Sequence, residues 1–312
     1  MGYAFSLALL LITNPLDPMS FLQVQMEDRT VAMADRADYT LPIGGVSLVD
    51  VNRLQTMMEA LAKLAYQEPI NATINNSGAI VPEKKGRKLH EGKFLQQFYE
   101  YYYGNGASTV QIPFQEIYPK VDQALMSQVR KKTIGQYTTY YNSRNKNRSH
   151  NIMLASKAIN NYVVLPGEIF SFNKVVGKRT KEKGYLQAPI IVRGELSEGI
   201  GGGICQVSST LFNAVDKAGL HIVQRYSHSR DVAYVRPGRD ATVSWYGPDF
   251  VFQNKYAYPI MIRAGSSNGS MYVSVHSFPE IEYEPRHVPS VHQSTPEEGP
   301  ASPPILTEPT MP

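Results

Sequence analysis

The sequence predicts an α+β protein in which a small α+β module is followed by a β-rich domain whose cysteine lies at the N-terminus of a helix. Apolar residues at helical spacing occur in four stretches, at 47–67, 91–102, 150–161 and about 205–218. Short alternating stretches bounded by Gly, Pro and Asn predict strands between them. The chain has 312 residues and is 42% hydrophobic, which is enough for two domains with cores of their own.

The composition divides the chain into an apolar start (1–22), a module (23–125), a second domain (126–278) and a tail (279–312). The start is similar to the hydrophobic region of a signal peptide, but no basic residue precedes it. It is also shorter than the about 20 residues that cross a bilayer. A signal peptide, a membrane attachment and a buried strand all remain open. The tail is rich in Pro, Glu and Ser, which predicts disorder.

Two helices and several strands are expected in the first module. The helix at 47–67 has candidate caps at Ser47 and Asp50. After it, the pattern predicts a strand, a turn at 76–78, a second short strand, a helix at 91–102 and a strand at 108–119. The segment from 121 to 149 turns polar and basic, and is interpreted as a connection.

In the second domain, a helix at 150–161 is expected to begin at a Ser149 cap. A strand, a turn at Gly194 and a loop lead into three glycines and the cysteine helix. Strands are expected at 220–226, 231–236 and 240–246, and a hairpin at 258–278 closes at Asn268-Gly269 or its neighbours.

Composition excludes several kinds of protein. A net charge of +4 and a pI near 8.9 are too mildly basic to indicate nucleic-acid binding. The single cysteine excludes an internal disulfide and cysteine-based metal sites, and the seven histidines form no HExxH or HxH pattern. No nucleotide-binding glycine motif is present either. Neither a metal nor an organic cofactor is therefore expected. The basic stretch 174–184 is interpreted as a solvated loop, with weak attraction to an anionic polymer as the alternative.

The stretch GIGGGICQVSSTLFNAVDKAGL places Cys205 at the beginning of a helix. The residues that follow form one apolar stripe, and Gly219 occupies the position favoured for a left-handed cap. Free N–H groups and the positive end of the helix dipole lower the pKa of a cysteine in such a place. A lone cysteine is also often just a small buried residue. The flanking glycines favour the functional interpretation.

The residues around Cys205 suggest roles in acyl transfer. The N–H groups of Gly202 and Gly203, with that of Cys205, are candidates for an oxyanion hole, and Gly201–Gly203 would let a substrate backbone approach closely. Ser208 and Ser209 follow Cys205 by three and four residues, so they share its side of the helix and could hydrogen-bond a peptide.

A thiolate nucleophile needs a base, and His228 is the candidate because it follows a strand that leads back from the cysteine helix. Asp231 or Asp240 could orient its imidazole. A substrate carboxylate could be held by an arginine, and the sequence does not choose among four candidates: Arg225, Arg230, Arg236 and Arg239.

Four motifs in order, GGGICQVSSTLFNA, RYSHS, YVRPGRDATV and FQNKYAYPIMI, closely resemble the VanW family over about 135–278. The segment at 70–120 resembles, more weakly, a peptidoglycan-binding module that often precedes VanW domains. The resemblance implies a bacterial, extracytoplasmic protein of the cell envelope that acts on peptidoglycan. Some members are regarded as L,D-transpeptidases with a cysteine nucleophile, which here would be Cys205.

Further residues match positions of the family motifs without roles that transfer, and several of them are candidate substrate contacts: Gln206, Ser208, His228, Ser229, Tyr234, Gly238 and Asp240. Family members usually begin with a clear transmembrane anchor, which the short apolar start does not match. The Pro-rich tail also lies outside the family pattern.

The expected function is therefore cysteine-dependent acyl transfer between peptidoglycan stem peptides through a thioester, with no cofactor. Two alternatives remain at this stage. One is a non-catalytic peptidoglycan-binding accessory protein, in which Cys205 only packs. The other is a cysteine peptidase that releases its acyl group to water. The oligomeric state, the diamino acid accepted and the mode of attachment are open.

Overall fold

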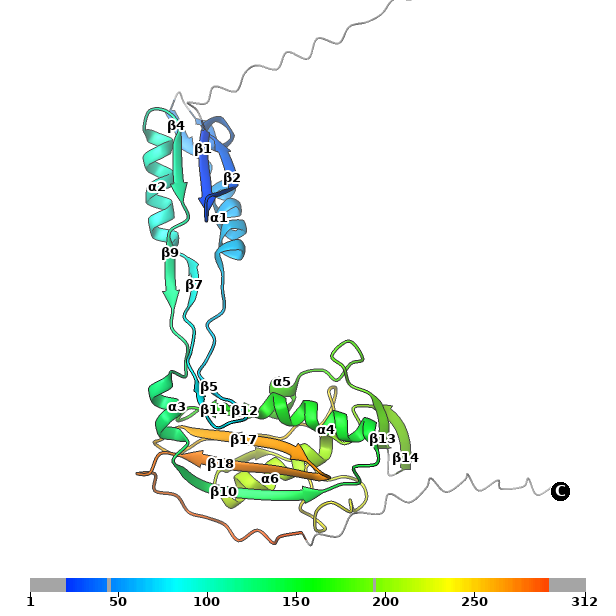
Figure 1. Ribbon diagram of the computed structural model, residues 1–312. Coiled ribbons are helices and arrows are strands. Elements are labelled where there is room, and N and C mark those ends of the chain that lie inside the picture. Colours follow the sequence, from blue (N-terminus) through cyan, green and yellow to red (C-terminus); the bar gives the residue numbers. More distant parts are fainter. Residues whose placement is uncertain (1–20, 44–45, 193–194, 292–312) are drawn as a thin grey trace, which may run out of the picture. The chain divides into compact units, whose positions relative to one another are not determined.

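The computed structural model describes residues 21–43, 46–192 and 195–291, and the chain forms two compact units (Figure 1). Of the described residues, the first unit contains those from 21 to 72 together with 82–122. The second contains 73–81 and those from 123 to 291. The chain therefore passes between the units three times. The predicted boundary at 125 is close to the last crossing, but the excursion at 73–81 was not expected.

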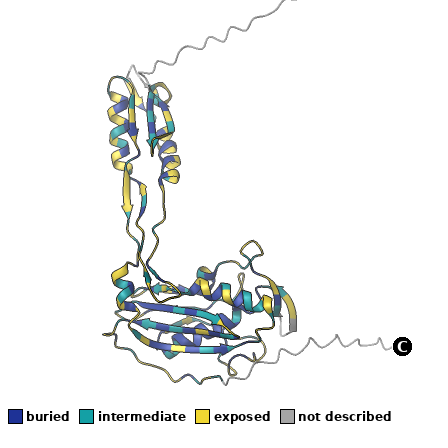
Figure 2. Ribbon diagram, in the orientation of Figure 1, coloured by how far each residue is buried: buried dark blue, intermediate teal, exposed yellow. Residues whose placement is uncertain are grey.

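The first unit is built on a three-stranded sheet of order β2-β1-β8, in which β1 and β8 run parallel. Its elements are β1 (Phe21–Met26), β2 (Arg29–Asp35), the short 3-10 helix η1 (Arg36–Tyr39), β3 (Thr40–Ile43), β4 (Val46–Val49), α1 (Val51–Ala65), β7 (Gly86–Leu89), α2 (Glu91–Tyr103), β8 (Ser108–Gln111) and β9 (Phe114–Ile117). The helices α1 and α2 pack on this sheet through a core that includes Leu54, Phe94 and Phe98 (Figure 2).

The expected helices of this unit are both present, and Asp50 is the residue that caps α1. Its carboxylate accepts hydrogen bonds from two N–H groups of the first turn. The predicted strand at 108–119 is instead two strands with different partners, since β8 pairs with β1, β9 pairs with β7, and Pro113 lies between them. Residues 21 and 22, predicted as part of the apolar start, belong to β1, whereas 1–20 lie outside the described residues.

The second unit centres on a four-stranded antiparallel sheet of order β10-β18-β17-β11. Three further groups of strands accompany it, of order β12-β16-β15, β13-β14 and β5-β6. The strands are β5 (Thr73–Ile74), β6 (Ile80–Val81), β10 (Lys132–Tyr140), β11 (Tyr162–Val164), β12 (Ile169–Ser171), β13 (Gln187–Val192), β14 (Glu195–Ile200), β15 (His221–Gln224), β16 (Val251–Gln253), β17 (Ile260–Ser267) and β18 (Ser270–Ser277). The hairpin β17–β18 turns at Asn268-Gly269, both with positive φ, as the sequence predicts.

Four helices complete this unit: α3 (Gln123–Val129), α4 (Lys146–Ile159), α5 (Phe172–Val176) and α6 (Ile204–Lys217). The cysteine helix α6 packs on β10 and β18, α4 packs on β17, and α4 and α6 contact each other. Every member of the predicted stripe on α6 is fully buried, which fixes the rotation of the helix: Val207, Leu211, Ala214, Val215 and Ala218. That rotation determines where Cys205 lies.

Several expectations for this unit are wrong. The stretch 121–149 is not a simple connection, because it contains α3 and the nine-residue strand β10. The helix α4 begins four residues earlier than predicted, since Asn145 rather than Ser149 accepts the N–H group of its first turn. Ser149 lies inside the helix and donates its hydroxyl to the Asn145 carbonyl.

The strands predicted at 231–236 and 240–246 are absent, and this part of the chain is irregular. Side chains of α6 take the place of a neighbouring strand there. Ser208 and Asn213 donate to the carbonyls of Ala241 and Arg239, and Ser209 accepts from the N–H group of Ala241. These bonds satisfy the backbone without a ladder.

The predicted disorder of the whole tail is also wrong for its first part. Ile281 and Val288 are buried, and the guanidinium of Arg286 donates to the Asp216 carboxylate and the Leu220 carbonyl at the end of α6. Residues 292–312 lie outside the described residues. Within the described ranges, no helix combines the length and the hydropathy needed to cross a bilayer.

Candidate active site

Cys205 lies in the first turn of α6, with Gly203 as the N-cap residue. From 201 to 215 every residue is buried except Cys205, which is partly exposed. The thiol donates toward the Val243 carbonyl, 3.5 Å away, and lies 3.8 Å from the Thr242 hydroxyl. An inert structural cysteine would be buried like its neighbours. Cys205 is therefore the one residue of that stretch that keeps some solvent exposure.

His228 and Asp240 come together on the loop beside Cys205. The Asp240 carboxylate oxygen Oδ2 lies 2.6 Å from the imidazole Nδ1 and accepts the backbone N–H group of His228, also at 2.6 Å. A carboxylate can only accept, so Nδ1 carries the proton and Nε2 is left for the thiol. The other predicted orienter, Asp231, is exposed. Arg225 donates to the Asp240 carbonyl and lies 3.5 Å from its carboxylate.

The charges in this triad favour a thiolate beside an imidazolium. Burial raises the pKa of the Cys205 thiol, but the hydrogen bond and charge of His228 outweigh it, so that the net pKa is lowered. Burial lowers the pKa of His228, whereas Cys205 and Asp240 raise it to a net increase. Burial raises the pKa of Asp240, and the N–H group and imidazole of His228 lower it by more. All three shifts support the ion pair.

The three glycines before Cys205 serve packing. Gly201 and Gly203 have φ of +88° and +103°, a region that other residues avoid. A Cβ on Gly202 would lie 2.5 Å from the Pro189 carbonyl oxygen, so the missing side chain admits strand β13. The expectation that these glycines make room for a substrate is therefore wrong. An oxyanion role for the N–H groups of Gly202 and Gly203 stays a prediction.

The close contact at Gly202 predicts that Gly202→Ala destabilises the second unit by about 3 kcal/mol, because backbone atoms cannot move aside as a side chain can. Gly167→Ala is the matched control. It has a φ of +79° but open space around it, so only about 1 kcal/mol is expected. Denaturant unfolding of both variants measures the difference. An equal loss of unfolding free energy in the two variants would show that β13 can move to make room for the added methyl group.

Three predicted substrate contacts are structural instead. Gln206, Ser208 and Ser209 are all 0% exposed. Gln206 bonds to the Thr139 hydroxyl, the Tyr140 carbonyl and the Arg148 guanidinium, and so joins α6 to β10 and α4. Both serines donate to the Cys205 carbonyl within the helix. The serines share the side of the helix that the spacing predicts, but loop 239–241 covers that side.

Two predicted arginine contacts are also held elsewhere. Arg239 donates to Asn213 and forms an ion pair of 2.7 Å with Asp216. Arg236 is exposed and donates to the Ser290 carbonyl. Ser229 is exposed next to His228 and remains a candidate contact. The hydroxyl of Tyr234 is buried, and burial followed by the charge of Cys205 raises the pKa of that phenol.

Sequence reasoning missed Arg179, whose guanidinium is partly buried and interacts electrostatically with Cys205. It lies in the basic stretch interpreted above as a solvated loop. Thr242 and Val243, which contact the thiol, were missed as well because they were assigned to a strand. A signal was present for Thr242 and Val243, which lie in the family motif YVRPGRDATV, but none distinguished Arg179 from its charged neighbours.

The family model described as "VanW like protein" matches residues 147–276, which include Cys205, His228 and Asp240. The chain is also 53% identical over 290 residues to the uncharacterised protein YoaR of Bacillus subtilis (strain 168), covering 93% of this chain and 96% of that protein. The chain belongs to the VanW family. No solved structure matches it.

A second relative of this VanW-family chain is the vancomycin B-type resistance protein VanW of Enterococcus faecalis (strain ATCC 700802 / V583). It is 36% identical over 83 residues, which cover 27% of this chain and 30% of that protein. The family resemblance predicted from the four motifs is thereby confirmed.

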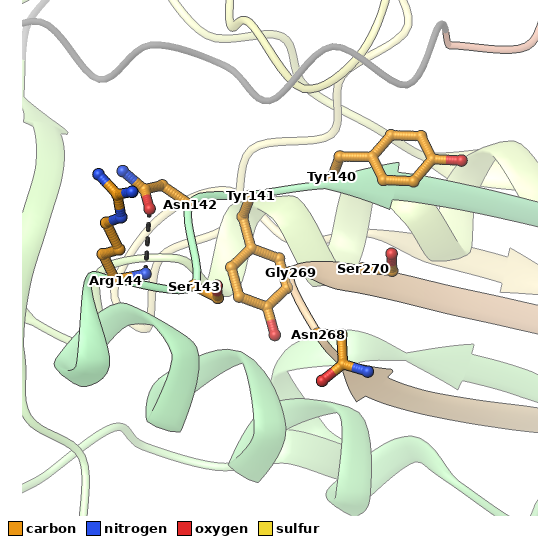
Figure 3. Close-up of a pocket in the computed structure, with 8 residues that line it drawn as sticks. All are labelled: Tyr140, Tyr141, Asn142, Ser143, Arg144, Asn268, Gly269 and Ser270. Atoms are coloured by element: carbon orange, nitrogen blue, oxygen red, sulfur yellow. Dashed lines mark hydrogen bonds between the residues drawn. The ribbon is translucent and has the colours of Figure 1, made fainter.

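A separate pocket of about 530 Å³ lies in this VanW-family domain where β10 ends and the β17–β18 hairpin turns (Figure 3). Tyr140, Tyr141 and Arg144 line it together with the Asn268-Gly269 turn. None of the triad residues is among those that line it, so it is not the site of the thiol. Among the described residues, no three His, Cys, Asp or Glu side chains gather as metal ligands do.

Proposed function

We propose that this protein modifies bacterial cell-wall peptidoglycan by acyl transfer through Cys205, in the manner of an L,D-transpeptidase. The observation that carries the proposal is a partly exposed cysteine at a helix N-terminus, whose thiol is paired with an imidazole that Asp240 holds by its other nitrogen. This is the arrangement of an activated nucleophile. The name of the Enterococcus relative, a vancomycin resistance protein, supports a cell-wall substrate.

The chemistry follows from the triad. The Cys205 thiolate attacks the carbonyl of a stem-peptide diamino acid, forming a C–S bond and a tetrahedral oxyanion. The imidazolium of His228 protonates the departing amine as the peptide bond to the terminal D-residue breaks, which leaves a thioester. An amine of a second stem peptide then attacks, gives its proton to His228 and releases the thiolate. Asp240 keeps the imidazole oriented throughout.

In this proposal the N–H groups of Gly202, Gly203 and Cys205 stabilise the oxyanion, and the positive end of the α6 dipole adds to them. Peptidoglycan as the partner and the cell envelope as the location belong to the same proposal. So does a wall-binding role for the first unit.

The test incubates purified tetrapeptide-stem muropeptides with the wild type, Cys205→Ala and Lys157→Ala, an exposed substitution on α4. Mass spectrometry follows loss of a terminal D-alanine, new cross-linked dimers and an acyl adduct on the intact protein. The wild type and Lys157→Ala are expected to give all three, and Cys205→Ala none. A folded wild type that changes no stem type would support the binding-protein alternative.

An added amine separates transfer from hydrolysis. With a D-amino acid in excess, a transferase incorporates the amine into the product, whereas a peptidase yields only the trimmed stem. Incorporation that depends on Cys205 is expected. If only the trimmed stem is formed, the reaction at this thiol is hydrolysis and not acyl transfer to an amine.

A further inference from the structure

Arg179 lies between the two chain segments that hold the thiol. Its Cβ and Cγ pack against Gly201, at 3.2 Å and 3.4 Å from the position that a Cβ would take there. Its Nη2 donates to the Asn173 side chain at 2.7 Å. The amide of Asn173 in turn donates to the carbonyl of Ser244, the residue after the carbonyl that accepts from Cys205. The aliphatic part of this side chain thus lies beside the helix start, and its guanidinium is tied through Asn173 to the loop.

One nitrogen of this guanidinium is unsatisfied. Nη1 of Arg179 is buried and has no hydrogen-bond acceptor among the residues that the structure describes. A buried donor without an acceptor is costly, more so when it is charged, and needs a reason. The Asn173 side chain carries no charge, and no ion pair within the described ranges includes Arg179. A negative charge placed nearby would offset that cost.

The Cys205 thiolate, once formed, places a negative charge close to this arginine. Burial lowers the pKa of Arg179, and the thiolate of Cys205 is first among the groups that oppose the decrease, ahead of Tyr185 and Asp249. A buried arginine keeps its charge, so it provides a permanent field at the thiol, unlike His228, which titrates.

We propose that Arg179 is a positioning residue that stabilises the Cys205 thiolate in the free protein as a second cation besides His228. Other groups also act at the thiol. The N-terminal end of α6 and His228 favour the thiolate, Asp240 acts through His228, and the buried hydroxyl of Tyr234 lies in the field of the thiolate and of Arg148. The inference deepens the proposed function, on which it rests in so far as Cys205 is the nucleophile.

The test measures alkylation of Cys205 in the intact protein, without any cell-wall substrate. The rate with neutral iodoacetamide is recorded against pH for the wild type, Arg179→Met, Arg179→Lys and Lys178→Met. In Arg179→Met the midpoint should rise by about one pH unit, which is about tenfold slower alkylation at a fixed pH below it. Arg179→Lys keeps the charge and should shift the midpoint less.

Lys178→Met is the matched control. Lys178 is exposed and bonds to the exposed Tyr246 hydroxyl at 2.7 Å, so its charge is screened and the midpoint should not move. A comparison of two alkylating reagents of different charge reports the electrostatic field at the thiol directly. Alkylation by anionic iodoacetate relative to iodoacetamide should fall in Arg179→Met but not in Lys178→Met.

A merely structural arginine would lower the unfolding temperature of Arg179→Met and leave both the midpoint and the reagent ratio of the folded protein unchanged. That result overturns the inference, and Arg179→Lys decides if Arg179→Met does not fold. An unchanged midpoint in an enzyme active on muropeptides would remove this inference alone. A shifted midpoint without any acyl transfer would remove the proposed function alone.

Discussion

Asp240→Asn should slow Cys205-dependent acyl transfer by about 10³- to 10⁴-fold, the size of effect seen when the orienting carboxylate of a catalytic triad is replaced. One oxygen of Asp240 accepts both the backbone N–H group and the Nδ1–H group of His228. An asparagine would present either one neutral acceptor or an NH₂ group there. The neutral imidazole would then no longer be held in the tautomer that carries its proton on Nδ1, and the imidazolium would lose the negative charge that stabilises it. The rate of thioester formation, measured by intact-protein mass spectrometry of samples quenched at successive times, checks this prediction.

Asp216→Asn provides the control for lost ion pairs. Asp216 accepts from Arg239 and Arg286 at 2.7 Å and 2.8 Å, so this variant also removes a carboxylate that two cations hold in the same unit. It touches no member of the triad, and transfer should stay within a few-fold of the wild type. Equal losses in the two variants would show that Asp240 acts only through stability.

The second large effect concerns His228 and pH. In the wild type, alkylation of Cys205 should rise with a midpoint below 9.0, the ordinary value, since the pKa of this thiol is lowered. His228→Gln removes the imidazole and leaves the burial that raises the pKa, so its midpoint should lie higher. At pH 7 we expect alkylation to be about 10²-fold slower. An unchanged midpoint in a folded His228→Gln protein would contradict the pairing.

The rate of acyl transfer should pass through a maximum as pH increases, and fall on both the acid and the alkaline side of it. Transfer begins as Cys205 loses its proton, so activity falls on the acid side as pH drops through the lowered pKa of the thiol. The departing amine needs the proton of His228, so activity falls again as pH rises through the raised pKa of the imidazole, above 6.5.

The same pKa shifts predict how stability changes with pH. Stability from the raised pKa of His228 is complete below 6.5 and is lost as pH rises through the folded value. Stability from the lowered pKa of Cys205 is complete above 9.0 and is lost as pH falls through its folded value. Thermal unfolding of the wild type and Cys205→Ala between these limits measures the difference.

Periodic elements could be predicted from the sequence, and elements held by individual side chains could not. The stripe on α6 and the Asn268-Gly269 turn produce regular patterns that local physics explains. The strand β10 was not predicted because its buried residues are Ile134, Gly135, Tyr137 and Thr139, a mixture that does not stand out as apolar and does not alternate regularly. Thr139 is nevertheless fully buried, since its hydroxyl bonds to that of Thr210.

The site divides in the same way. Cys205 was found from its place after glycines at a helix start, and His228 from its place after a strand. The choice between Asp240 and Asp231 depends on the path of an irregular loop. That path is fixed by long-range bonds such as Arg225 to the Asp240 carbonyl and Ser208 to the Ala241 carbonyl, which leave no periodic trace. Arg179 was beyond prediction for a similar reason, since only the fold brings it to Gly201.

Because the hairpin β5–β6 belongs to the unit that carries the thiol, that unit is not one continuous segment of the chain. Residues 73–81 are encoded within the first unit, yet Ile74 exchanges hydrogen bonds with Asn161, and Gly78 accepts from Arg130 in the second. Excising the chain at residue 123 would leave those side chains without the backbone they bind. Producing the unit that carries the thiol by itself would therefore require a gene that joins the codons for 73–81 to those from 123 onward, and not a simple truncation.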